Sequence, residues 1–182
     1  MRFFLIIFLL SLSCSQRSVE NIIFTHELLK LEYPNTWERL EEKEMLFAIS
    51  KHPKLKASSH EENPNLIIVA QDSIALFNDK ITNYTDFLHG FKQHQLAKPN
   101  IELAEDFAVL NINETKLDVI KYKIQGEHLT FLQTQYFFSN FGQYVMITLT
   151  HEFDKPNKEL STIIGTLEVV RHEPLEQLRT QN

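Results

Sequence analysis

Hydrophobic residues recur along this chain with two different periods, which predict strands in some stretches and helices in others. Near the C-terminal half, four segments of strand length follow one another, over residues 101–111, 115–125, 128–139 and 143–151. In the last of these, Val145, Ile147 and Leu149 alternate with mixed positions, which is typical of a strand with one buried face. Gly126 and Gly142 separate the last three segments, so we expect consecutive antiparallel hairpins.

Two other segments show the helical period. Apolar residues at i, i+3, i+4 and i+7 form one stripe along a helix. The stripes consist of Tyr84, Phe87, Leu88 and Phe91, and of Leu160, Ile163, Ile164 and Leu167. Thr82 or Asn83 can cap the first helix, which should end near Lys98, and Asp154 and Pro156 open the second. We expect these side chains to be buried: Phe87, Leu88, Phe91, Ile163 and Ile164.

Shorter apolar runs complete the pattern. Residues 25–33 predict a strand that stops at Pro34, and residues 45–50 predict another. Residues 66–70 form a continuous apolar run, consistent with a strand buried on both faces. Residues 51–64 are polar and predict a long exposed loop, and residues 167–171 predict either a last strand or a continuation of the second helix. Strands, helix, four strands and helix together predict an α+β fold, an antiparallel sheet with helices packed on it.

The N-terminus carries a different signal. Arg2 is followed by the apolar run Phe3–Leu10, the layout of a secretory signal peptide, and the run is too short to cross a bilayer as a helix. The only cysteine, Cys14, follows at once, and Leu10–Cys14 resembles a bacterial lipobox. We therefore expect cleavage before Cys14 and attachment of acyl chains such as palmitate to it. The alternative is a cleaved signal peptide that leaves a free thiol.

These segments define the expected domain organisation. Residues 1–13 are a signal peptide, 14–22 the lipidated cysteine and a tether, 23–171 one α+β domain, and 172–182 a polar tail. Ser15 follows Cys14, in place of the aspartate that retains some lipoproteins at the inner membrane. The expected location is the bacterial cell envelope, lipid-anchored at the periplasmic face of the outer membrane.

Charge and motifs exclude several function classes. The 182 residues carry a formal charge of −6, which argues against nucleic acid as a partner. His89 and His94 would lie about 140° apart on a helix, so they cannot chelate a metal together. The sequence contains no Gly-x-Ser-x-Gly elbow and no phosphate-binding glycine loop. We therefore predict no catalytic residue, no metal ligand and no cofactor.

Aromatic residues are the remaining candidates for a binding surface. Phe138 and Phe141 lie beside the expected turn before Gly142, and Trp37 follows a proline turn. Most of these rings are expected to pack in the core. The alternative is that Trp37, Phe138 and Phe141 contact a partner, which we expect to be an envelope protein.

Three stretches together resemble the PsbP-like fold, which small bacterial lipoproteins of the DcrB type share. They are the opening Leu31–Trp37 with its Tyr-Pro and Trp, the strand Leu66–Ala70 leading to the helix Tyr84–Phe91, and the hairpins 116–122, 129–138 and 144–150. The family's usual Asn-Gly turn is Asn113-Glu114 here. The resemblance implies a domain that is usually non-enzymatic and that binds a partner or stabilises an assembly.

Two other functions stay open. One is an envelope enzyme, such as a hydrolase, whose groups converge from separate strands, with His128 or His151 facing a carboxylate. The other is a carrier that encloses a small hydrophobic ligand.

Overall fold

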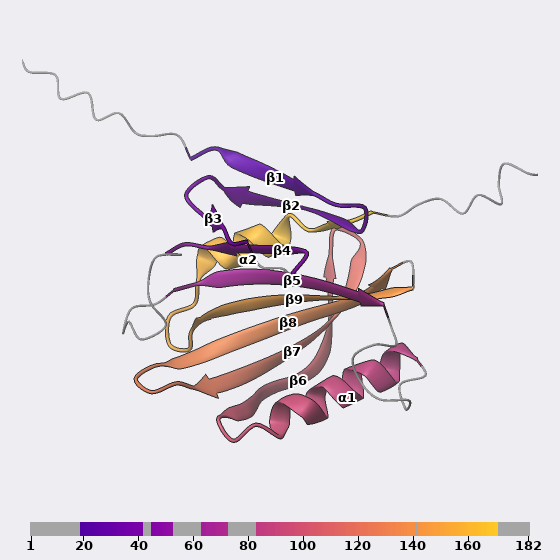
Figure 1. Ribbon diagram of the computed structural model, residues 1–182, viewed down its shortest axis with the longest axis vertical. Coiled ribbons are helices and arrows are strands. Elements are labelled where there is room, and N and C mark those ends of the chain that lie inside the picture. The colour runs from indigo at the N-terminus through magenta and orange to yellow at the C-terminus, as the bar shows by residue number, and fades with distance from the viewer. Residues whose placement is uncertain (1–18, 42–44, 53–62, 73–82, 141, 171–182) are drawn as a thin grey trace, which may run out of the picture.

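The computed structural model describes residues 19–41, 45–52, 63–72, 83–140 and 142–170 (Figure 1). The expected signal peptide, Cys14 and the tail 172–182 lie outside these ranges. The described elements are β1 (Asn21–Thr25), β2 (Leu29–Pro34), β3 (Glu38–Arg39), β4 (Phe47–Ser50), β5 (Asn65–Asp72), α1 (Tyr84–Leu96), β6 (Ile101–Ile112), β7 (Thr115–Gln125), β8 (Thr130–Asn140), β9 (Gln143–Glu152), α2 (Lys158–Gly165) and β10 (Glu168–Val169).

The larger sheet has seven antiparallel strands in the order β3-β4-β5-β9-β8-β7-β6. The hairpins β6–β7, β7–β8 and β8–β9 follow chain order, as the glycine-separated segments predicted. β5 lies between β4 and β9, which explains its apolar run. Leu66 and Ile68 are fully buried, whereas Ile67 and Val69 on the other face are only half-buried. The expectation of a strand buried on both faces is therefore met fully on one face and only in part on the other.

The smaller sheet joins the two ends of the domain. Its order is β1-β2-β10, so β2 pairs with its sequence neighbour on one side and with the last described strand on the other. Lys30 pairs with Glu168 and Leu29 with Val169. The segment after α2 is thus a strand, not a continuation of the helix.

The first hairpin, β1–β2, differs from the single strand predicted over residues 25–33. The backbone turns at Glu27 and Leu28, where His26 and Leu29 exchange two hydrogen bonds, His26 N to Leu29 O at 2.9 Å and Leu29 N to His26 O at 3.3 Å. The turn contains no glycine, asparagine or proline, so it gave no turn signal in the sequence. The side chain of Leu28 is buried, which holds the turn against the domain.

Two hydrophobic cores lie on opposite faces of the larger sheet. The larger core fills the space between this sheet, α2 and the smaller sheet, and includes Leu31, Trp37, Ile147 and Leu160. The second core lies under α1 on the other face, where Phe87, Leu88 and Phe91 contact Ile120, Tyr122 and Phe137. Figure 1 shows α1 beside β6 and β7, on the far side of the sheet from β1 and β2.

The helices begin at the residues that satisfy their free amide groups. Asn83 accepts a hydrogen bond from Asp86 N, and Asn157 accepts one from Leu160 N, both through the side chain. The apolar stripes face the cores, and all five side chains that we expected to be buried are buried: Phe87, Leu88, Phe91, Ile163 and Ile164. Within the described ranges, no helix has the length and apolar character needed to cross a bilayer.

The backbone of the β6–β7 turn adopts a left-handed conformation, which glycine tolerates best. Asn113 and Glu114 have φ values of 45° and 64°, the arrangement of a two-residue turn with both central residues left-handed. Asn113 also ties this turn to α2 and its exit, because its Nδ2 donates to Gly165 O at 3.0 Å and Leu167 O at 3.1 Å. The turn is therefore a structural contact as well as a connection.

We expect Glu114→Gly to raise the free energy of unfolding by about 0.5–1 kcal/mol, because glycine adopts positive φ without a clash of its Cβ. The matched variant Glu114→Val should lower it by about 1 kcal/mol or more, since a β-branched residue fits this region worst. Urea unfolding of the three proteins measures both changes. A glycine variant less stable than the parent would show that the Glu114 side chain outweighs the backbone.

Candidate functional site

The candidate site is a notch between two hairpins that diverge. The β7–β8 ladder runs from Gln125 and Thr130 only as far as Asp118 and Phe137. Beyond that point β7 continues to pair with β6 as far as Thr115, and β8 with β9 as far as Asn140. The ends of β7 and β8 therefore separate and leave an opening between them.

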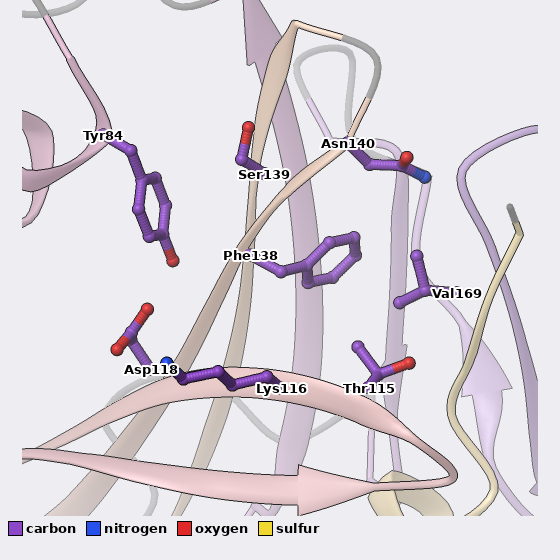
Figure 2. A pocket seen from close by; sticks show the side chains of 8 residues that line it. All are labelled: Tyr84, Thr115, Lys116, Asp118, Phe138, Ser139, Asn140 and Val169. Carbon is purple, nitrogen blue, oxygen red and sulfur yellow. The ribbon is translucent and has the colours of Figure 1, made fainter. Parts of the chain in front are cut away.

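The opening is a pocket of about 420 Å³ close to the start of α1 and to β10. We call it the hairpin notch, and these residues line it: Tyr84, Thr115, Lys116, Asp118, Phe138, Ser139, Asn140 and Val169. Figure 2 shows Tyr84 and Asp118 on one side, Thr115 and Val169 on the other, and Phe138 between them. Six of these eight side chains carry a polar group, so the notch suits a polar or amphipathic occupant.

Tyr84 reaches the notch because it is the first residue of α1. Its ring packs against Tyr144, with centroids 5.5 Å apart, and stacks on Phe87 at 6.4 Å. Its hydroxyl is buried and points toward the Asp118 carboxylate, the acceptor that faces it across the notch (Figure 2). Burial, and then the negative charge of Asp118, raise the pKa of Tyr84 far above its ordinary value. The phenol is therefore a hydrogen-bond donor at physiological pH and not a base.

Asn140 fixes the opposite side of the notch. Its side-chain Nδ2 donates to Leu28 O at 3.3 Å and to Val170 O at 3.0 Å, which links β8 to the adjoining backbone just before β2 and just after β10. A neighbouring hollow of about 530 Å³ continues along Asn113, Glu114, Thr115, Glu168 and Val169. Hydrogen bonds to backbone on this side hold the wall in place, so the notch is preformed.

The notch presents both charged groups and hydroxyl groups. Lys116 and Asp118 supply opposite charges, and Tyr84, Thr115 and Ser139 supply hydroxyl groups. No histidine or cysteine is among the described residues that line it, so no hydroxyl there has an imidazole to activate it as a nucleophile. Across the described residues, no group of three metal-ligating side chains comes together.

The structure places the aromatic candidates differently from one another. Trp37 is 2% exposed and lies in the larger core, where its Nε1 donates to Glu159 Oε2 at 2.9 Å. Lys51 donates to the other oxygen, Glu159 Oε1, at 2.8 Å. The hydrogen bond from Lys51, and to a smaller extent that from Trp37, hold the pKa of Glu159 below its ordinary value, although partial burial acts in the opposite direction. Trp37 is thus anchored inside the domain.

Phe138 is 4% exposed, but its ring forms part of the wall of the notch. Phe141 and Cys14 lie outside the described residues.

The histidines of the enzyme alternative lie away from the notch. His128 Nε2 is 3.9 Å from Glu127 Oε2 at an exposed turn, and His151 Nδ1 contacts Glu152 O at 2.7 Å. Neither histidine lines the hairpin notch.

Sequence reasoning missed the polar residues of the notch. The helical spacing places Tyr84 in the apolar stripe of its helix, and Lys116 and Asp118 fall within an expected strand. The only available signal was that Lys116, Asp118 and Ser139 fall near hairpin ends. Their meeting depends on where the β7–β8 ladder stops, which no local pattern specifies.

Comparisons with known proteins concern the fold. No known family model matches the sequence, and a search of curated proteins found no significant match. Cyanobacterial PsbP (CyanoP) from Synechocystis sp. PCC 6803 has a similar solution structure, with a TM-score of 0.53 and 14% identity over 87% of this chain and 96% of that one. A protein of unknown function from Pseudomonas aeruginosa gives a TM-score of 0.52 and 16% identity, over 85% of this chain and 98% of that one.

A crystal structure from Bacteroides thetaiotaomicron VPI-5482 aligns with 79% of this chain at 15% identity and a TM-score of 0.48, and this chain spans only 46% of the length of that one. At such identities, similarity with a TM-score above one half establishes the fold alone. The structures of PsbP and of the Pseudomonas protein meet that condition. The chain therefore has a PsbP-like fold, in which antiparallel sheets carry packed helices, as the order of elements along the sequence predicted.

Proposed function

We propose that the protein is a lipid-anchored, non-catalytic binding factor of the bacterial cell envelope, held at the periplasmic face of the outer membrane. The observation that carries the binding role is the hairpin notch, a preformed pocket whose ionisable groups suit recognition better than catalysis. The signal-like run Phe3–Leu10 and the lipobox-like residues before Cys14 support the anchor and the location. The PsbP-like fold is compatible with this role but does not name the partner.

The lining of the notch favours a protein partner over a small apolar ligand. A carrier would enclose its ligand in a mostly apolar cavity, whereas Lys116 and Asp118 present charge beside Phe138 and Val169. An apolar centre flanked by polar groups is the usual composition of a protein interface. We therefore expect an envelope protein to contact the notch through a side chain that combines apolar and polar groups.

Site-specific crosslinking tests this role. A photo-crosslinking amino acid replaces Lys116, which is exposed and lines the notch, in the membrane-anchored protein in intact cells. We expect a discrete crosslinked envelope protein, because the probe sits at the contact. The added substitution Asp118→Asn should lower the yield, since it removes the charge beside Tyr84.

The matched control carries the probe at Glu127, an exposed residue just beyond the opposite end of β7. This position should give no discrete product. If both positions gave the same crosslinked protein, or if the probe at Lys116 gave no crosslinked protein, the notch would not be the binding site.

A further inference from the structure

Three aliphatic side chains are exposed within a stretch of five residues, one just before β1 and two on it. Val19, Ile22 and Ile23 are 61%, 41% and 62% exposed. We call them the β1 edge. β1 is the outer strand of the smaller sheet, so one of its sides has no neighbouring strand within the described part of the chain. Exposed aliphatic groups of this size are more stable when something apolar covers them.

The aliphatic groups of the β1 edge lie on both sides of the strand. Ile22 pairs with Tyr33, whose ring faces the larger core, so Ile22 lies on the inner face. Ile23 pairs with the exposed Glu32, so it lies on the outer face. Val19 precedes both. Because its apolar groups lie on two faces, the β1 edge does not offer one flat surface to a folded protein. A lipid bilayer is fluid and can contact both faces at once.

The short tether determines which medium lies next to this edge. Val19 follows Cys14 by five positions, so even a fully extended chain spans at most about 17 Å between them. Under the proposed function, which this inference rests on, Cys14 carries acyl chains and lies at the membrane surface. The β1 edge must then stay close to that surface. In Figure 1, α1 lies at the other end of the molecule from β1, and β6 runs from beside α1 toward the smaller sheet.

We infer that the β1 edge rests on the bilayer that holds the anchor, with Val19, Ile22 and Ile23 in contact with lipid. Glu20 and Asn21 are exposed between them, so the contact lies at the headgroup level, where these polar groups stay hydrated. β6 also exposes aliphatic side chains, at Leu103, Val109 and Leu110. The tether to Cys14 does not hold this strand near the membrane. The anchor and the β1 edge together orient the domain, with α1 directed away from the lipid.

The cysteine content makes this orientation measurable. Cys14 is the only cysteine, and lipidation converts its thiol to a thioether, so an introduced cysteine is a unique labelling site in the lipidated protein. Ile23→Cys reports on the β1 edge. Leu103→Cys is the matched control, because Leu103 is also an aliphatic strand residue, 38% exposed, and lies near the start of β6, which follows α1. Each variant is purified lipidated, labelled with an environment-sensitive fluorophore and reconstituted into phosphatidylcholine–phosphatidylglycerol vesicles.

Quenching by lipids with a spin-labelled headgroup gives the result. We expect quenching at position 23 to exceed that at position 103 by about twofold or more, because the first label lies within about 5–10 Å of the headgroup boundary. Equal quenching at both positions in protein that floats with the vesicles would overturn the orientation and leave the anchor intact. Protein that does not float would show that the anchor is absent, and the orientation would fail with it.

Discussion

Replacing Phe137 with alanine is expected to remove about 3–5 kcal/mol of the free energy of unfolding, the largest change we predict for one side chain. Phe137 is completely buried at the centre of the core under α1. Its ring meets three others edge-on, with centroid distances of 5.9 Å to Phe87, 5.1 Å to Phe91 and 6.1 Å to Phe107. The truncation leaves a cavity and removes the contacts that attach α1 to the sheet. Domains of this size have a total stability of about 5–15 kcal/mol, so the loss is large.

Urea unfolding of the mature chain, followed by far-ultraviolet circular dichroism, measures this change. Phe153→Ala is the control, since Phe153 is 37% exposed and Lys123 Nζ lies over its ring, 4.8 Å from the centroid. That variant should lose less than about 1 kcal/mol. If the two variants lost the same free energy, the packing of α1 on Phe137 would not hold the domain together.

Cys14→Ser is expected to move nearly all of the protein from the membrane fraction to the soluble fraction. Each buried CH₂ of an acyl chain contributes about 0.8 kcal/mol to membrane binding, so losing the chains removes most of the affinity. The exposed β1 edge, three aliphatic side chains flanked by Glu20, is too small to replace them. Membrane fractionation and the intact mass of the mature protein give the answer.

Ser15→Ala serves as the control for this experiment, because it leaves Cys14 in place and should keep the protein membrane-bound. The mass distinguishes a cleaved chain from one that retains residues 1–13. A Cys14→Ser protein that is cleaved and still bound to the membrane would place the anchor elsewhere in the chain.

Local periodicity predicted most of the larger sheet and both helices. The segment 115–125 coincides with β7, and α1 begins at Tyr84 behind its Asn83 cap, because apolar spacing and capping act within a few residues. The β1–β2 hairpin was not predicted, since Glu27 and Leu28 turn the chain without a turn residue. Their conformation is fixed by the burial of Leu28 and by pairing along the strands, which are tertiary effects.

The hairpin notch was beyond prediction for a related reason. Leu117 and Phe138 are buried apolar residues that continue the alternation of their strands, so nothing in either segment indicates that the β7–β8 ladder has already ended. β6 has register irregularities between Leu103 and Ala108, where it pairs with β7. Such bulges bend strands and change their twist. A site that depends on the divergence of two hairpins can therefore be located only in three dimensions.

The pairing of β2 with both β1 and β10 constrains the order in which the chain folds. Lys30 meets Glu168, which lies 138 positions later, so the smaller sheet closes one of the longest loops in the domain. Contacts between residues so distant in sequence form late, because the entropy of loop closure precedes any gain from them. Until β10 pairs with β2, the smaller sheet that packs on the larger core is incomplete. For a protein exported as proposed, the domain cannot complete its fold before β10 has crossed the membrane. Until then the chain stays incompletely folded, which is the state that export through a membrane requires.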